Sequence, residues 1–382
     1  MGAVAALACA ASDGGKAGGS GAAGSTSGGA SGAGGAAGTG GAAGAGGGGE
    51  AGSGRAGGSS GSSGAGAGQG DASSDANDGG ALDAPAGDSG DAADGGNPEP
   101  TLGCPAGSGA GPLGGSRPAP LKVPAGYTPT KKYPLVLELA GRGGTGTDAE
   151  NAFKMAAMAD ANQLFVIAPT GTYDSPPPPT APATFWNATD ACCNMYGSKV
   201  DDVVYLRSLI CHTKSNYSID PNKVFIIGGS NGAFMAHRMA CDAADLVTAI
   251  IAISGLTWND PSKCKPTHPV SVLQIHGTLD DIVPFGGTPK LFWGPAPSAT
   301  QTYQTWASLN GCTGPDVAGP TVDFDKNIAG AETTTQFKAI DGTCKVATQL
   351  FVVNKGTHVF NISSSTKQFF IDWFKATPPN HP

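Results

Sequence analysis

Short apolar runs alternate with amphipathic segments through most of the chain after residue 130. Continuous apolar runs favour buried strands, and apolar positions three and four residues apart favour helices. This pattern predicts strands over Leu135–Gly141, Leu164–Pro169, Lys223–Gly228, Val247–Ser254, Val270–His276 and Leu350–Val353. It predicts helices over Asp148–Ala161, Asp201–Asn216, Asn231–Cys241, Thr300–Leu309 and Lys367–Lys375. Apolar strands alternating with helices indicate an α/β fold, with a mostly parallel sheet covered by helices on both faces.

The first hundred residues lack this pattern. Residues 14–100 consist almost entirely of Gly, Ala, Ser and Asp, and Leu82 is their single large aliphatic residue. Such a segment cannot bury enough apolar surface to offset its chain entropy, so we predict a disordered linker over residues 10–100. Residues 101–382 are numerous enough to form one large domain with its own core.

The acidic charge belongs to the same N-terminal segment. The chain has a net charge of −8, and residues 1–100 contain ten acidic and two basic residues. The remainder is therefore electrically balanced, and it shows no cluster of basic residues. This distribution gives no argument for a nucleic-acid partner, and it favours an extended, soluble linker.

The start of the chain resembles the end of a bacterial export signal. Residues 1–9 form a short apolar run of small residues that ends at Cys9, an imperfect match to a bacterial lipoprotein signal. We expect Cys9 to carry a lipid anchor, with an Ala-rich disordered start as the alternative. The linker would then let an anchored domain reach away from a surface, which predicts an extracellular or outer-surface location.

Eight further cysteines support export. They are Cys104, Cys192, Cys193, Cys211, Cys241, Cys264, Cys312 and Cys344. An even number of cysteines in an exported chain predicts up to four disulfides. Because Cys192 and Cys193 are adjacent, we expect each to pair with a separate partner. Their spacing does not suggest a zinc site, and the sequence indicates neither a metal nor an organic cofactor.

The sequence Gly-Gly-Ser230-Asn231-Gly is the first motif with chemical meaning. It follows a predicted strand and opens a predicted helix, which is the setting of a nucleophile elbow. A serine hydroxyl in such a turn becomes nucleophilic when a nearby base accepts its proton. The motif therefore predicts Ser230 as a nucleophile, with a Gly-rich turn and a helix-capping serine as the alternative.

Two later segments supply an acid and a base. Asp280 follows the strand that ends at His276, and His358 follows the strand over Leu350–Val353. The order Ser, Asp, His along the chain is that of α/β-hydrolases, in which the acid orients the histidine. Asp281 is the competing acid. His276 is the competing base, although we favour a structural hydrogen bond near the site for it.

Other residues are expected around this triad. The Gly-rich segment Leu139–Gly144 follows a strand and can present a backbone N–H to a developing oxyanion. We assign the two donors to the backbone N–H groups of Arg142 and Asn231. Trp186 and Trp258 are candidates for lining a substrate cleft, with core packing as the alternative.

Several motifs in the same order resemble one family of extracellular esterases. They are VPAGY over Val123–Tyr127, WNATDACC over Trp186–Cys193, the Val200–Gly255 segment, HGTLDDIVPFGG over His276–Gly287 and WASLNGC over Trp306–Cys312. Together they are similar to the polyhydroxybutyrate depolymerases and feruloyl esterases. The resemblance implies an α/β-hydrolase catalytic domain over residues 101–382, with Ser230, Asp280 and His358 as its triad.

The resemblance also narrows the expected activity. It implies a serine carboxylic-ester hydrolase, with feruloyl or acetyl esters of plant polysaccharide as the expected substrates. Depolymerisation of a short-chain polyhydroxyalkanoate is the alternative. A non-catalytic surface binding protein is a more distant alternative, which the complete triad disfavours.

Overall fold

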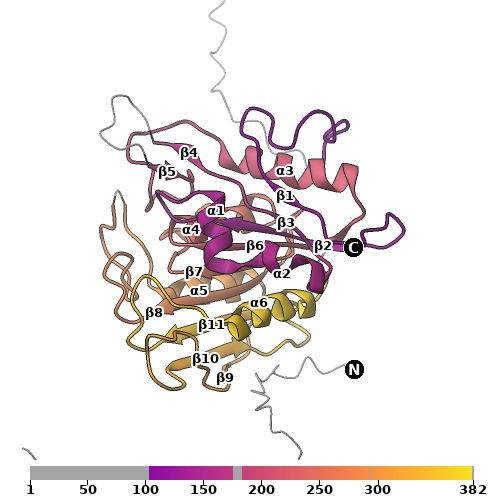
Figure 1. Ribbon diagram of the computed structural model, residues 1–382. Helices are drawn as coiled ribbons and strands as arrows, with labels where there is room; N and C mark the ends of the chain where they lie inside the picture. The colour runs from indigo at the N-terminus through magenta and orange to yellow at the C-terminus, as the bar shows by residue number, and fades with distance from the viewer. Residues whose placement is uncertain (1–102, 175–182, 293, 381–382) are drawn as a thin grey trace, which may run out of the picture. The chain divides into compact units, whose positions relative to one another are not determined.

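A computed structural model describes residues 103–174, 183–292 and 294–380 of the chain (Figure 1). The predicted signal over residues 1–9, including Cys9, and the predicted linker over residues 10–100 lie outside the described residues. Both therefore remain predictions. Among the described residues, no helix is long and apolar enough to cross a membrane.

The described residues form a nine-stranded sheet in the order β1-β3-β2-β6-β7-β8-β11-β10-β9. Its strands are β1 Leu121–Lys122, β2 Tyr133–Leu139, β3 Phe165–Ile167, β6 Ile219–Gly229, β7 Ala249–Ile253, β8 Ser271–Gly277, β9 Asp316–Ala318, β10 Thr333–Lys338 and β11 Thr348–Val353. The strands from β3 to β11 in this order are parallel, whereas β1, β10 and β9 pair antiparallel at the two edges. Strands β4 Thr172–Tyr173 and β5 Thr184–Phe185 form a separate antiparallel pair.

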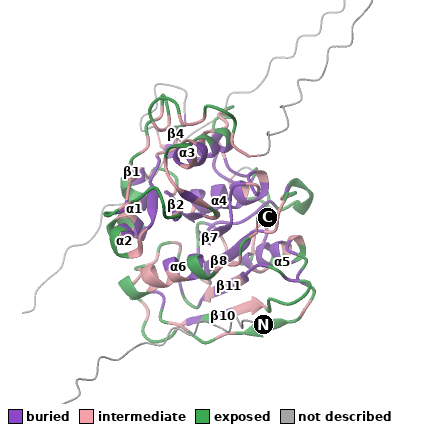
Figure 2. Cartoon of the chain, turned by 90° about the vertical axis from the view of Figure 1, so that its right-hand side faces the viewer, coloured by how far each residue is buried: buried purple, intermediate pink, exposed green. Residues whose placement is uncertain are grey.

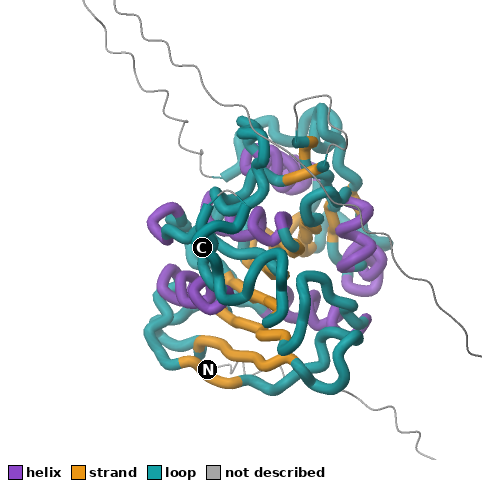
Figure 3. The backbone as a smooth tube through the Cα atoms, turned by 90° about the vertical axis from the view of Figure 1, so that its left-hand side faces the viewer, coloured by secondary structure: helices purple, strands orange, loops and turns teal. Residues whose placement is uncertain are grey.

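Helices cover both faces of this sheet (Figures 2 and 3). The helices are α1 Gly146–Phe153, α2 Met155–Asn162, α3 Asp202–Asn216, α4 Asn231–Asp242, α5 Ala299–Leu309 and α6 Ser364–Ala376. Successive strand residues point to opposite faces. Leu135 and Leu137 accordingly join the core beneath α3, α4 and α5, whereas Val136 joins the core beneath α1, α2 and α6.

One predicted helix is divided in two. The pattern predicted a single helix over Asp148–Ala161, but Lys154 adopts a left-handed conformation, with φ of 61°, between α1 and α2. One carboxylate caps the new N-terminus at this point: Glu150 accepts the N–H groups of Ala156 and Ala157. Free N–H groups at a helix N-terminus favour negative charge. The spacing of apolar residues does not reveal such capping, so the sequence prediction missed the break.

The predicted fold class is confirmed for the described residues. A mostly parallel sheet in this order, with helices on both faces, is the α/β-hydrolase fold. The strands that the pattern missed are short or lie at the edges. Among them β10 reads TTTQFK, which offers too few apolar residues for a strand prediction.

All eight cysteines of the domain are paired, as expected. The disulfides are Cys104–Cys211, Cys192–Cys193, Cys241–Cys264 and Cys312–Cys344. The expectation that Cys192 and Cys193 would have separate partners was wrong. The other six cysteines pair among themselves across the fold, so these two neighbours have only each other.

Candidate active site

A sharp turn between β6 and α4 presents Ser230. The residue has φ of 51° and ψ of −122°, outside the regions that side chains ordinarily favour. Glycines make the turn possible. A Cβ on Gly232 would lie 2.1 Å from the carbonyl oxygen of Leu139, and one on Gly228 would lie 2.2 Å from that of Gly232. Backbone strain held in place by such packing is common at functional sites.

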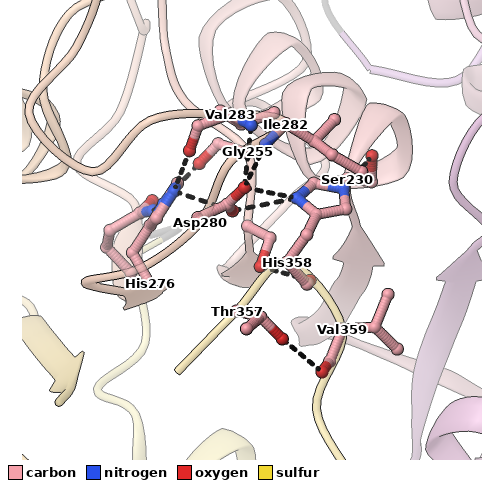
Figure 4. Close-up of polar contacts among 11 residues, drawn as sticks. Ser230, Gly255, His276, Asp280, Ile282, Val283, Thr357, His358 and Val359 are labelled. Atoms are coloured by element: carbon pink, nitrogen blue, oxygen red, sulfur yellow. Dashed lines mark hydrogen bonds and ion pairs between the residues drawn. The ribbon is translucent and has the colours of Figure 1, made fainter. Parts of the chain in front are cut away.

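The side chains of Ser230, His358 and Asp280 meet in one hydrogen-bonded line (Figure 4). His358 Nε2 lies 2.9 Å from Ser230 Oγ. His358 Nδ1 lies 3.0 Å from Asp280 Oδ1 and 2.9 Å from Oδ2. Each residue follows the carboxyl end of a parallel strand: β6 for the serine, β8 for the acid and β11 for the histidine. The topology thus brings together residues that are up to 128 positions apart.

The surroundings of Asp280 keep its carboxylate ionised. Its side chain is buried, and its Oδ1 accepts the N–H groups of Ile282 and Val283 at 3.0 and 2.8 Å. Burial alone would raise the pKa of Asp280, but hydrogen bonds from His276, His358 and Val283 hold that pKa well below its ordinary value. A lasting negative charge beside His358 Nδ1 favours the tautomer whose Nε2 is free to accept a proton from the serine.

The backbone of the histidine loop is also fixed. The buried Ser254, directly after β7, donates from its hydroxyl to the carbonyl oxygen of His358 at 2.9 Å. The Leu279 N–H donates to the Gly356 carbonyl at 2.8 Å, which joins the acid loop to the histidine loop. The sequence prediction did not include Ser254. Its only signal was its place at the end of a strand, next to Gly255.

The two predicted oxyanion donors border the serine. A Cβ on Gly141 would lie 3.1 Å from Ser230 Cβ, so the backbone before Arg142 passes directly beside the nucleophile. Among the described residues, neither the Arg142 N–H nor the Asn231 N–H donates a backbone hydrogen bond. Two free N–H groups beside a nucleophile are what an oxyanion requires. Their role as donors remains a prediction.

Side chains hold both donors in place. The Arg142 guanidinium forms an ion pair with the buried Asp174. The Asn231 side chain forms two hydrogen bonds with the backbone of Trp186, accepting its N–H at 2.7 Å and donating to its carbonyl at 3.0 Å.

Trp186 is therefore a structural residue. It is 1% exposed, and its indole N–H donates to the Ala140 carbonyl at 3.1 Å. The prediction that Trp186 lines the substrate cleft was wrong, since its ring is packed in the core behind the nucleophile turn. Trp258 is also buried, at 8% exposed, with its remaining edge in a groove beside α5 that includes no triad residue.

The competing acid Asp281 and the competing base His276 do not occupy the triad positions of Asp280 and His358. Asp281 is exposed to solvent. His276 is fully buried, and its Nε2 lies 2.8 Å from the Val283 carbonyl and 3.2 Å from Asp280 Oδ2 (Figure 4). It contacts the acid and not the serine, which agrees with the structural hydrogen bond that we favoured for it.

Exposed apolar side chains flank the acid and the base. Leu279 and Ile282, on either side of Asp280, are 60% and 47% exposed, and Val359, next to His358, is 73% exposed. These three residues adjoin the acid and the base in sequence.

Comparison with known proteins finds similarity to esterases over part of the chain. A family model described as Phospholipase/Carboxylesterase matches residues 131–290, a range that includes Ser230 and Asp280 and ends before His358. The chain is 28% identical over 205 residues to feruloyl esterase B of Piromyces equi, covering 51% of this chain. It is 25% identical over 233 residues to feruloyl esterase C of Emericella nidulans, covering 58% of this chain and 74% of that protein. The predicted resemblance to feruloyl esterases is confirmed.

These matches are partial. The alignment spans 35% of the length of the Piromyces protein. Among solved structures, an acetyl xylan esterase from Aspergillus awamori matches with a TM-score of 0.44 and 17% sequence identity, over 67% of this chain and 93% of that one.

Proposed function

We propose that this protein is a serine carboxylic-ester hydrolase that acts through an acyl-enzyme on Ser230. The observation that carries the proposal is the line from Asp280 through His358 to Ser230, with both hydrogen bonds between 2.9 and 3.0 Å. A nucleophile, a base and a residue that orients the base are the elements of acyl transfer. The match to the Phospholipase/Carboxylesterase family model supports the same chemistry.

The first half of the reaction forms the acyl-enzyme. Ser230 Oγ bonds to the ester carbonyl carbon while its proton moves to His358 Nε2. The carbonyl oxygen becomes an oxyanion, which the N–H groups of Arg142 and Asn231 stabilise by hydrogen bonds. The tetrahedral species then collapses, the bond to the alcohol oxygen breaks, and His358 returns its proton to the departing alcohol.

The second half releases the acid. A water molecule transfers a proton to His358 Nε2 and bonds to the acyl carbon. Collapse of this second tetrahedral species breaks the bond to Ser230 Oγ, which recovers the proton. Asp280 remains a carboxylate throughout and stabilises the imidazolium that forms twice in each cycle.

Feruloyl esters, with acetyl esters as a related class, are the proposed substrates. The relatives named feruloyl esterase support this choice. Plant polysaccharide is the proposed carrier of these esters. We also propose that the protein is exported, because four disulfides within one domain are typical of oxidising compartments.

The test compares substrates and a nucleophile variant. Hydrolysis of p-nitrophenyl acetate, methyl ferulate and soluble hydroxybutyrate oligomers is measured for the wild type, Ser230→Ala and the exposed control Ser262→Ala. We expect turnover of methyl ferulate that falls by about 10⁶-fold in Ser230→Ala and is unchanged in the control. Turnover of the acetate or the oligomers without the ferulate would contradict the feruloyl assignment. A folded wild type without Ser230-dependent turnover of any of them would contradict the proposal for these ester classes.

A further inference from the structure

A buried polar chain runs through the core behind the triad and ends at Asp280. Its side chains are Trp306 on α5, His237 on α4, and Gln274 and His276 on β8, all of them fully buried. Polar groups in such a place are retained only when their hydrogen bonds are satisfied. The chain thus connects the nucleophile helix α4 to the strand that precedes the acid.

The direction of every hydrogen bond in this chain is fixed from its two ends. An indole N–H can only donate, so His237 Nδ1 must accept from Trp306 at 2.9 Å. A neutral His237 then carries its proton on Nε2 and donates it to Gln274 Oε1 at 2.9 Å. Burial lowers the pKa of His237 to about 4, which agrees with a neutral ring at physiological pH.

The contacts of Gln274 and His276 at the other end of the chain require the same donor and acceptor assignment. The Gly255 carbonyl oxygen can only accept, and it lies 2.9 Å from the side-chain nitrogen of Gln274. The Gln274 amide therefore presents its N–H₂ group on this side, where it also faces His276 Nδ1 at 3.3 Å. His276 Nδ1 accordingly accepts, and the proton of the neutral ring lies on Nε2.

This tautomer is the one that the acid loop requires. Two acceptors face His276 Nε2: the Val283 carbonyl at 2.8 Å and Asp280 Oδ2 at 3.2 Å. An Nε2 lone pair in that position would repel both oxygens. With its proton present, His276 holds the loop at two points, since the Val283 N–H in turn donates to Asp280 Oδ1 at 2.8 Å.

We propose that His276 is a positioning residue for Asp280, and that the chain of Trp306, His237 and Gln274 fixes the tautomer in which it acts. The inference rests on the proposed esterase function, because positioning Asp280 matters through His358 and Ser230. The titratable groups in contact with Asp280 are His276 and His358, while its neighbour Asp281 is exposed. A change in the pH dependence of kcat/KM is therefore attributed to the interaction of Asp280 with these two histidines.

A pair of variants of nearly equal shape tests the role. His276→Met removes the donor, whereas the amide N–H of His276→Gln can still reach the acid loop. On p-nitrophenyl acetate, we expect His276→Met to lower kcat by about 10- to 100-fold, the scale of a lost hydrogen bond to a charged group, with little change in KM. The acid limb of its kcat/KM profile moves to higher pH, because a carboxylate with one donor fewer binds the His358 imidazolium more strongly. In His276→Gln, we expect kcat and the position of the acid limb to return most of the way to the wild-type values.

The matched control is His212→Met on α3, remote from the triad, which should match the wild type. Wild-type kcat and an unchanged acid limb in a folded His276→Met protein would overturn the proposal. The ¹⁵N spectrum of wild-type imidazoles provides a test that needs no variant. Nε2–H forms at both His237 and His276 would support the proposal, and an Nδ1–H form at His276 would overturn it.

The proposed function is judged separately by Ser230-dependent turnover of the wild type. Active wild type with an unaffected His276→Met variant contradicts the positioning role alone. A wild type that lacks turnover contradicts the proposed esterase function. The ¹⁵N measurement of the His276 tautomer then still tests the hydrogen-bond directions from which the positioning role is inferred.

Discussion

Ser230 combines a reactive hydroxyl with a backbone conformation that side chains rarely adopt. Its φ of 51° is tolerated because glycines surround it: a Cβ on Gly255 would lie 2.6 Å from the Ser230 carbonyl oxygen. The motif and its place between a strand and a helix were enough to predict this residue. Ser254 and the tautomer of His276 could not be predicted, since both depend on contacts between segments distant in sequence.

A second buried carboxyl, Glu138 on β2, makes stability depend on pH. Burial raises its pKa well above the ordinary value, and the neighbouring Glu150 carboxyl adds to the rise. The folded protein therefore favours the neutral form. This contribution to stability is complete at pH values below the pKa of an unfolded-chain glutamate, and it is lost as the pH rises through the raised pKa of the folded state.

Glu138→Gln should remove this dependence. Glutamine keeps an oxygen that can accept the Met155 N–H and carries no charge at any pH. Free energies of unfolding, measured by urea titration at several pH values, test this effect of Glu138→Gln. We expect the wild type to lose stability towards alkaline pH relative to Glu138→Gln, while the exposed control Asp323→Asn follows the wild type. Parallel curves for the wild type and Glu138→Gln would contradict this account of Glu138.

At the scale of elements, the position of α4 against β2 decides whether the site forms. Gly232 in the first turn of α4 is packed so closely on β2 that a Cβ would lie 2.1 and 2.6 Å from the carbonyl oxygens of Leu139 and Ala140. The same turn provides the Asn231 N–H. Close approach of a helix to a strand end leaves no room for a side chain, so this position requires glycine.

Gly232→Ala should separate α4 from β2. We expect a loss of about 1–3 kcal/mol in unfolding free energy, since the clash is with backbone atoms, together with a fall in kcat. Gly342→Ala is the control, because a Cβ there meets no atom within 4 Å. Its effect on stability should stay within about 0.5 kcal/mol. Equal stability and equal kcat for Gly232→Ala and the wild type would refute the close packing.

The elements that the sequence predicted are those with a strong apolar pattern. The buried parallel strands and the helices of the central sheet follow it, and the observed β7 and β8 lie within or next to their predicted ranges. The break at Lys154 was missed because its cause is capping of α2 by the Glu150 carboxylate on α1. The polar β10 was missed because its pairing with β11 is set by the fold and not by its own composition.

At the scale of the whole molecule, disulfides connect distant parts of the domain. Cys104–Cys211 joins the start of the described chain to α3 and closes a span of 107 residues, whereas Cys241–Cys264 closes a span of 23. Longer loops lose more entropy when they are closed in the unfolded state. The pairing itself was beyond prediction, because adjacency of Cys192 and Cys193 pointed to the wrong partners.

Removing each of these two disulfides should show this difference. Double substitution to alanine at Cys104 and Cys211 should lower the unfolding free energy by about 1 kcal/mol more than the same change at Cys241 and Cys264. Denaturant titrations of the two variants measure it. A larger loss for the shorter loop would show that native packing around the cysteines, and not loop closure, dominates.

The central claim is that Ser230 carries an acyl group during turnover. The most direct measurement is mass spectrometry of the protein quenched with acid during hydrolysis of p-nitrophenyl acetate. The account predicts one added acetyl group, located on the peptide that contains Ser230 and absent in Ser230→Ala. Turnover by wild type with no adduct in rapidly quenched samples, or an adduct on Ser230 that does not decay when the substrate is exhausted, would contradict it.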